Sequence, residues 1–172
     1  LFFLFLYNRR LKRFFMAFVL VPITVLGVDS STTIQTFHDY DQIPVYARAP
    51  IDVLIQKGIL TGNSDGNFAP AREINRAEFA KLIVEASTVK KYTPLTPSFT
   101  DVKSGDWFYT YVETAKREGW IDGYPNGLFQ PADPINRAEI AKILTLAFDF
   151  SISQSNDDQY WFDPYVRALA ER

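Results

Sequence analysis

The stretch Ile-Asn-Arg-Ala-Glu-Phe-Ala-Lys-Leu at residues 74–82 returns as Ile-Asn-Arg-Ala-Glu-Ile-Ala-Lys-Ile at residues 135–143. In both places an asparagine stands three residues before a glutamate, just ahead of apolar residues at helical spacing. This is the capping-box pattern of a helix start. We expect the side chains of Asn75 and Asn136 to accept hydrogen bonds from first-turn amides, and the glutamates to reach back to the cap amides. The stretch therefore predicts two equivalent helices.

The arginine in each stretch occupies the first helical position, where a cation opposes the helix dipole. An arginine repeated at that position is easiest to understand if an anion lies beside it. Free amides, the positive end of the dipole and the guanidinium would then converge on one anion. We therefore expect Arg76 and Arg137 to bind an anionic group, and the alternative is a surface arginine paired with a nearby acid. For Glu78 and Glu139 the cap is the primary role and a ligand contact the secondary one.

The two stretches belong to a longer internal repeat. A Phe-x-Asp motif opens the first copy at residues 37–39 and the second at residues 99–101, and a Trp-Phe pair at residues 107–108 returns at residues 161–162. Nine positions, four of them in the quoted stretch, recur at a constant offset of 61 residues: Gly58, Gly62, Gly66, Phe68, Pro70, Ile74, Arg76, Glu78 and Lys81 match Gly119, Gly123, Gly127, Phe129, Pro131, Ile135, Arg137, Glu139 and Lys142. The chain thus divides into repeat 1 (37–88), a linker (89–98), repeat 2 (99–149) and the start of an incomplete repeat 3 (150–172).

Each repeat is expected to fold as a helix, a tight loop and a second helix. Hydrophobic periodicity predicts first helices over residues 44–57 and 106–118, with Val45 and Trp107 on their inward faces, and second helices over residues 76–87 and 137–148. Asp-Gly and Asn-Gly turns fill the loops. The glycines assigned to caps and turns are Gly62, Gly66, Gly123 and Gly127. Two helices bury too little surface alone, so the repeats should pack together into an all-α fold.

Composition limits the class of protein. Of the 172 residues, 47% are hydrophobic and none is a cysteine, so the chain can form a core but has no disulfide or thiolate chemistry. The net charge is −2, and all residues after the basic cluster at 9–13 together carry −6. Such an acidic body does not attract nucleic acid, which we exclude as a partner.

The segments of the N-terminal region follow one another in the order typical of a signal peptide. The basic cluster precedes a thirteen-residue, mainly apolar run at residues 16–28, shorter than the roughly 20 residues of a membrane span. We therefore predict that residues 1–28 are a signal peptide, with an uncleaved N-terminal membrane anchor as the alternative, and that polar residues 29–36 are a linker. Export follows from either reading, and membrane contact is expected only through residues 1–28.

No catalytic or metal-binding motif stands out. An EF-hand loop with Gly66 at its sixth position would run from Thr61 to Arg72, and neither end supplies the required oxygen ligand. His38 is the only histidine and has no cysteine companion for a metal site. The sequence also lacks nucleophile-elbow, phosphate-loop and zinc motifs. We expect no enzyme activity, no cofactor and no metal.

Taken together, the motifs resemble the S-layer homology (SLH) repeat. The resemblance rests on Phe-x-Asp, the aromatic residue that opens the first helix, Gly-Ile/Trp-x-x-Gly, Asp/Asn-Gly-x-Phe-x-Pro and Ile-Asn-Arg-Ala-Glu, and it covers residues 37–172. It implies a pseudo-threefold helical bundle of three repeats. It also implies grooves that hold cell-wall polysaccharide, often with pyruvate ketals, and so attach exported bacterial proteins to the wall. The family motif is usually Thr-Arg-Ala-Glu, and here Asn75 and Asn136 replace the threonine.

The resemblance also assigns the groove residues. It implies ligand binding by an arginine and an aromatic residue of the copies: Arg76, Arg137, Trp107, Trp161 and, in the first copy, Tyr46. For the tryptophans, core packing and sugar stacking remain alternatives. Lys81 and Lys142 lie about one helical turn beyond the arginines, where they either add charge to the site or face solvent.

These observations lead to one functional prediction with two alternatives. We expect a non-catalytic module that anchors an exported protein at the cell wall or S-layer by binding an anionic, pyruvylated cell-wall polysaccharide or another peptidoglycan-linked polymer. One alternative is the anchor region of an extracellular polysaccharide-degrading enzyme. The other is the N-terminal part of an S-layer or outer-membrane structural protein.

Overall fold

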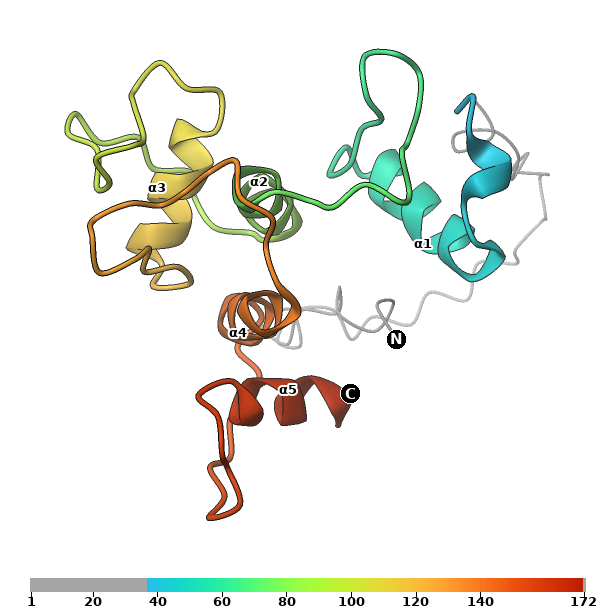
Figure 1. Cartoon of the computed structure of the whole chain (residues 1–172). Helices are drawn as coiled ribbons and strands as arrows, with labels where there is room; N and C mark the ends of the chain where they lie inside the picture. The colour runs from blue at the N-terminus through green and yellow to red at the C-terminus, as the bar shows by residue number, and fades with distance from the viewer. Residues whose placement is uncertain (1–36, 172) are drawn as a thin grey trace, which may run out of the picture. The chain divides into compact units, whose positions relative to one another are not determined.

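The computed structural model describes residues 37–171, so the predicted signal peptide or anchor and the predicted linker at 29–36 lie outside the described residues. The elements are η4 (Tyr40–Gln42), α1 (Val45–Gln56), α2 (Arg76–Ala86), α3 (Tyr109–Arg117), α4 (Arg137–Ala147) and α5 (Asp163–Ala170) (Figure 1). Within residues 37–171 no strand forms, and the prediction of an all-α fold is confirmed. None of the helices in this range has the length and apolar character needed to cross a membrane.

Both predicted capping boxes are formed. The side chain of Asn75 accepts from the Glu78 amide at 2.8 Å, and the Glu78 carboxylate accepts from the Asn75 amide at 3.0 Å. The corresponding distances between Asn136 and Glu139 are 2.9 and 3.1 Å. These reciprocal bonds fix the first turn because they satisfy amides that have no partner inside the helix. Helices α2 and α4 accordingly begin at the predicted residue.

The chain forms two compact units, and their boundary falls between Pro70 and Ala71, inside repeat 1. The first unit contains η4 and α1, and its core consists of Ile43 and Ile51 with partly buried neighbours that include Phe37 and Phe68. The second unit, residues 71–172, contains α2 to α5. The compact units therefore do not coincide with the sequence repeats.

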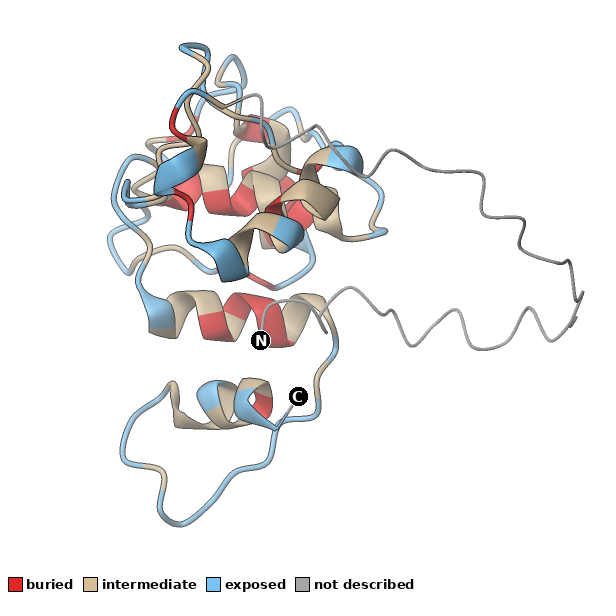
Figure 2. Ribbon diagram, turned by 90° about the vertical axis from the view of Figure 1, so that its right-hand side faces the viewer, coloured by how far each residue is buried: buried red, intermediate tan, exposed pale blue. Residues whose placement is uncertain are grey.

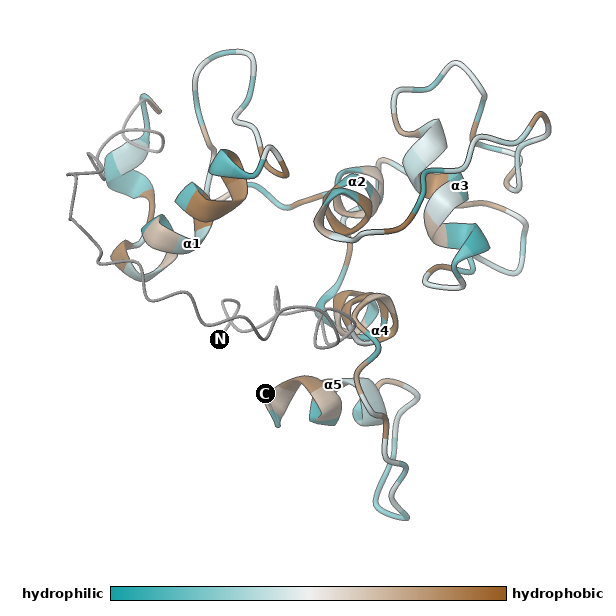
Figure 3. Cartoon of the chain, turned by 180° about the vertical axis from the view of Figure 1, so that it is seen from behind, coloured by the Kyte–Doolittle hydropathy of each residue, from teal (hydrophilic) through white to brown (hydrophobic). Residues whose placement is uncertain are grey.

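In the second unit the helices pair across the repeat boundaries. Helix α2 packs against α3 and α4 packs against α5, so that the second helix of one repeat meets the first helix of the next (Figure 1). The buried core includes Phe79, Val84, Tyr109, Val112 and Phe129. Figure 2 shows buried residues along α4. The buried residue of α5 is Ala168. Hydrophobic residues concentrate on the helices, whereas the connecting loops are mostly hydrophilic (Figure 3).

The Phe-x-Asp motif locks the loop of each repeat. The carboxylate of Asp101 accepts from the amides of Phe129 and Gln130 at 2.8 and 2.7 Å, and that of Asp39 accepts from Phe68 and Ala69 at the same distances. The phenylalanine of the motif explains why residue 123 is a glycine. A Cβ on Gly123 would lie 2.3 Å from Cε1 of Phe99, and Gly123 also has a φ of +73°. The glycine that recurs in both repeats therefore leaves room for the phenylalanine ring that recurs with it.

The segment predicted as a linker, residues 89–98, is fastened along α3, and we call it the strap. The amide of Tyr92 donates to Thr114 Oγ1 at 2.9 Å, and the amide and hydroxyl of Ser98 donate to the carboxylate of Glu113 at 2.8 and 2.6 Å. The hydroxyl of Tyr109 donates to the carbonyl oxygen of Pro94 at 2.7 Å. These bonds hold the backbone of the strap on α3, although most of its side chains are exposed.

Candidate functional site

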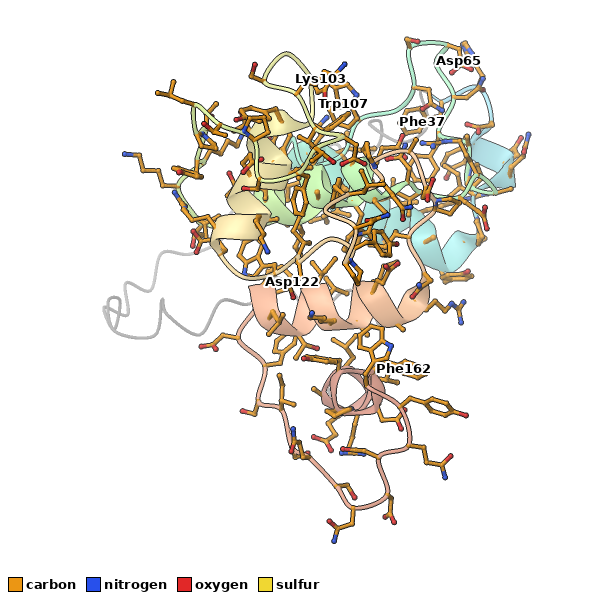
Figure 4. The ribbon with its side chains drawn as sticks, turned by 60° about the vertical axis from the view of Figure 1, so that its left-hand side comes forward. Phe37, Asp65, Lys103, Trp107, Asp122 and Phe162 are labelled. Atoms are coloured by element: carbon orange, nitrogen blue, oxygen red, sulfur yellow. The ribbon has the colours of Figure 1, made fainter. Side chains whose placement is uncertain are left out.

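A groove with a volume of about 240 Å³ lies in the second unit, and residues from all three repeats line it. Repeat 1 contributes Arg76 and repeat 3 contributes Trp161. Repeat 2 contributes the remaining lining residues: Trp120, Ile121, Asp122, Gly123, Glu139, Lys142 and Ile143. Figure 4 shows Asp122 next to α4, the helix that carries Lys142.

Arg76 is the most enclosed charged group of the groove, with 7% of its side chain exposed. Its Nη1 lies 2.6 Å from a carboxylate oxygen of Glu139, and its Nε donates to the carbonyl oxygen of Phe129 at 2.8 Å. The rings of Tyr124 and Phe129 lie 4.8 and 4.9 Å from its Cζ. Its third nitrogen, Nη2, donates to no protein group among the described residues.

The start of α2 does not offer free amides, so that part of the sequence expectation is wrong. The amide of Arg76 donates to the carbonyl oxygen of Asp133, and the amide of Ala77 donates to that of Pro131, both at 3.0 Å. The repeat that follows supplies these acceptors, and it also supplies Glu139 as the anion beside the guanidinium. Backbone and side chain of Arg76 therefore join repeat 1 to repeat 2.

Arg137 has different surroundings from Arg76, although the two sequence stretches match. It is exposed, and within residues 37–171 it makes no ion pair. The structure thus brings Arg76 into the groove and leaves Arg137 on the surface of the second unit.

The two capping glutamates also differ in their partners. Glu78 receives two hydrogen bonds from the guanidinium of Arg72, both at 3.0 Å. Partial burial opposes ionisation of Glu78, but the hydrogen bonds from Arg72 and the Asn75 amide lower its pKa below the ordinary value. Glu139 pairs with Arg76 instead and also receives the hydroxyl of Tyr124 at 3.3 Å. One glutamate is thus paired within its own repeat, and the other is paired with the preceding repeat.

A second ion pair lies at the groove and involves the lysine whose role the sequence left open. The Nζ of Lys142 lies 3.0 Å from one carboxylate oxygen of Asp122, and the Nζ of Lys116 lies 3.5 Å from the other. The hydrogen bond from Lys142 is the largest cause that lowers the pKa of Asp122 below its ordinary value. Sequence reasoning missed Asp122 and Trp120 as groove residues. Their only signal was their position in the Gly-Trp-x-x-Gly loop, which reads equally well as a turn.

The predicted aromatic residues are exposed. Trp161 lines the groove with 57% of its surface exposed, and it meets the ring of Phe162 edge-on at 5.6 Å. Trp107 has 58% of its surface exposed and meets Phe108 edge-on at 5.3 Å. Tyr46, in the first unit, is 85% exposed. The expectation that Trp107 belongs to an inward helix face is wrong, because it precedes α3 in a turn and is largely exposed.

No group of His, Cys, Asp and Glu residues in the described part of the chain is arranged to hold a metal ion. The groove brings together two cations, the two carboxylates that pair with them and an exposed tryptophan. This combination suits a polar ligand with an anionic substituent and a flat apolar face.

Several curated proteins are similar to this chain. The "Surface-layer 125 kDa protein" of Lysinibacillus sphaericus is 28% identical over 138 residues, which is 80% of this chain and 12% of that protein. The "Cellulosome-anchoring protein" of Acetivibrio thermocellus is 29% identical over 127 residues, or 72% of this chain and 27% of that protein. "Exoglucanase XynX" of Acetivibrio thermocellus is 30% identical over 113 residues, or 66% of this chain and 10% of that protein. The chain thus spans about a tenth to about a quarter of the length of these relatives.

The family comparison is more direct. The model of the S-layer homology domain matches residues 36–80 and 98–141, which together make up just over half of the chain and overlap the two complete repeats. The chain therefore belongs to the S-layer homology family.

Proposed function

We propose that this chain anchors an exported bacterial protein to the cell wall by binding an anionic, pyruvylated polysaccharide in the groove. The observation that carries the proposal is the meeting of Arg76, Lys142 and the exposed Trp161 around one groove. The S-layer homology domain is a non-catalytic anchoring module, and relatives named as surface-layer and cellulosome-anchoring proteins support a location at the cell surface.

Each groove residue has a distinct role in this proposal. The face of Trp161 stacks on the apolar face of a sugar ring. Lys142 and the Nη2 of Arg76 bind the carboxylate of the pyruvate ketal, and Glu139 accepts a hydrogen bond from a sugar hydroxyl. The groove volume of about 240 Å³ is below the roughly 300–1,000 Å³ of typical small-ligand pockets, so we expect it to take about one substituted sugar.

The remaining predicted site residues belong to the same proposal as ligand residues outside this groove. They are Arg137, Trp107, Tyr46 and Glu78. Several weak sites on one chain add through their effective concentration, so the affinity for a long polymer exceeds that of any single groove.

The proposal is tested by retention of the chain on purified bacterial cell walls. Lys142→Ala and Trp161→Ala should each reduce the bound fraction, because each removes a proposed ligand contact while the affected side chain is far from fully buried. Lys103→Ala is the matched control, since it removes a lysine from an exposed turn outside the groove. Walls stripped of their attached polysaccharide should retain none of the variants. Undiminished retention of both groove variants would contradict the proposal.

A second candidate function is the anchor region of an extracellular polysaccharide-degrading enzyme. The similarity to the exoglucanase over only 10% of that protein favours it, because such a short match indicates an accessory module. A third candidate is part of an S-layer or outer-membrane structural protein, in line with the surface-layer relative. The groove would serve the same purpose in each case, and the full reading frame around this chain decides between them.

A further inference from the structure

Every cation of the groove already holds a carboxylate of the chain itself. Arg76 pairs with Glu139 at 2.6 Å, and Lys142 pairs with Asp122 at 3.0 Å. The formal charges of these four groups cancel. An acidic ligand that binds Lys142 must therefore compete with Asp122 for this cation.

The two ion pairs differ in how easily they open. The Arg76–Glu139 pair is largely enclosed, with 7% and 20% of the side chains exposed, and Phe129 and Tyr124 hold it with further hydrogen bonds. The side chain of Asp122 is 65% exposed. An exposed ion pair contributes little free energy because water replaces it readily, whereas opening an enclosed pair leaves a desolvated charge. The pair that yields to a ligand is therefore Lys142–Asp122.

We propose that Asp122 is an internal competitor that holds Lys142 until the carboxylate of an acidic sugar displaces it, and so sets the affinity of this groove. This inference rests on the proposed function. The first repeat has Thr61 at the position of Asp122 and Lys81 at the position of Lys142. A threonine cannot form an ion pair, so this competitor is specific to the second repeat.

The test is the affinity of Asp122→Asn for a small acidic probe, a pyruvylated N-acetylhexosamine methyl glycoside, measured by titration calorimetry on the whole chain. We expect the dissociation constant to fall by about two- to fivefold, which corresponds to the strength of one exposed ion pair. The neutral methyl ester of the same glycoside should bind the wild-type chain and the variant equally, because it has no charge with which to displace Asp122.

Two further variants separate competition from other effects. Asp157→Asn removes the same charge from an exposed loop outside the groove and should leave the dissociation constant unchanged. In the background of Lys142→Ala, Asp122→Asn should bring no gain, because the contested cation is gone and Lys116, which also pairs with Asp122, is not among the residues that line the groove. A gain that persists in this background, or that extends to the neutral ester, would overturn the inference.

The outcomes also distinguish this inference from the proposed function. If the wild-type chain binds the acidic probe and Asp122→Asn binds it equally or more weakly, Asp122 is no competitor while the proposed function stands; weaker binding would mean that it positions Lys142. If neither the wild-type chain nor any variant binds the probe or purified walls, the proposed function fails and the inference falls with it.

Discussion

Arg76 joins two repeats through a set of contacts that only a guanidinium can make. Its Nε and Nη1 donate in different directions, to Phe129 and Glu139, while two aromatic rings lie near its Cζ. A lysine has a single charged nitrogen and no planar group, so it could not replace these contacts together. Burial makes the arrangement sensitive, because the loss of one partner leaves the other charge uncompensated. In the proposed function, this one side chain would serve both the contact between the repeats and the ligand.

The two matched arginines should therefore differ sharply in their effect on stability. We expect Arg76→Ala to reduce the free energy of unfolding of the second unit by about 3 kcal/mol, since it leaves Glu139 without its enclosed partner. Arg137→Ala removes an exposed side chain and should change the free energy of unfolding by less than about 0.5 kcal/mol. Urea titration followed by tryptophan fluorescence measures this, because all three tryptophans lie in the second unit.

Equal shifts for the two variants would show that the Arg76–Glu139 pair does not stabilise the contact between the repeats. The expected difference also affects how binding is tested. A loss of wall retention in Arg76→Ala would combine lost folding with lost ligand contact. The side chain of Lys142 is 28% exposed, so Lys142→Ala disturbs the fold less and reports on the groove more directly.

At the scale of secondary-structure elements, the strap and α3 behave as one element. Glu113 lies on the face of α3 that the strap covers, and its side chain is almost fully buried. Its carboxylate accepts both hydrogen bonds offered by Ser98, so a buried acid is satisfied by the strap rather than by a cation. The strap thus supplies the hydrogen bonds that a buried carboxylate of α3 requires, and it supports the helix pair formed by α2 and α3.

Glu113→Ala should detach one end of the strap. We expect a loss of about 2 kcal/mol in the free energy of unfolding, because the amide and hydroxyl of Ser98 lose a charged acceptor. The Ser98 amide should exchange with deuterium much faster, whereas the Tyr92 amide, which donates to Thr114, should keep more of its protection. Ser98→Ala is the matched control, since it removes only the hydroxyl bond and retains the amide bond. Unchanged protection at Ser98 in Glu113→Ala would show that the bond to Glu113 does not hold the strap.

The elements also show what the sequence could and could not predict. The starts of α2 and α4 were predictable because a capping box is local and uses residues three positions apart. Val45 was wrongly placed on an inward face and is 78% exposed. Periodicity identifies a face of a helix but not how far along the helix the core extends, and Val45 is the first residue of α1. The pairing of α2 with α3 depends on tertiary packing, which no local pattern encodes.

The same distinction applies to the groove. The repeat indicated Arg76 and Trp161, because recurrence marks positions that serve a common purpose. It did not indicate that Glu139 would be the partner of Arg76, since the two residues are 63 positions apart and meet only when the repeats pack. Asp122 was missed because its position differs between the copies, and a search for recurring residues passes over it.

At the scale of the whole chain, carboxylates with lowered pKa values occur in both compact units. Hydrogen bonds from the Phe68 and Ala69 amides lower the pKa of Asp39 in the first unit, and hydrogen bonds from Lys91 and Tyr111 lower that of Glu85 in the second. The pKa of Glu78 is lowered as well, chiefly by Arg72 against the effect of partial burial. In each case the ionised form is favoured by the folded chain, so folding and ionisation are linked.

The linkage predicts that the fold loses stability in acid. A carboxyl group whose pKa is lower in the folded chain contributes stability above its unfolded pKa, about 3.9 for Asp and 4.3 for Glu, and loses that contribution as the pH falls through the folded value. We expect the melting temperature, measured by circular dichroism, to be nearly constant from about pH 5 to pH 8 and to fall below about pH 4.

Glu78→Gln isolates one group, since glutamine retains a capping acceptor but cannot ionise. It should be less stable than the wild-type chain at pH 7, by less than about 1 kcal/mol because the pair with Arg72 is partly exposed, and the difference should vanish near pH 2.5. A difference that stays constant down to pH 2.5 would mean that the stabilisation by Glu78 comes from its shape and neutral hydrogen bonds rather than from its charge.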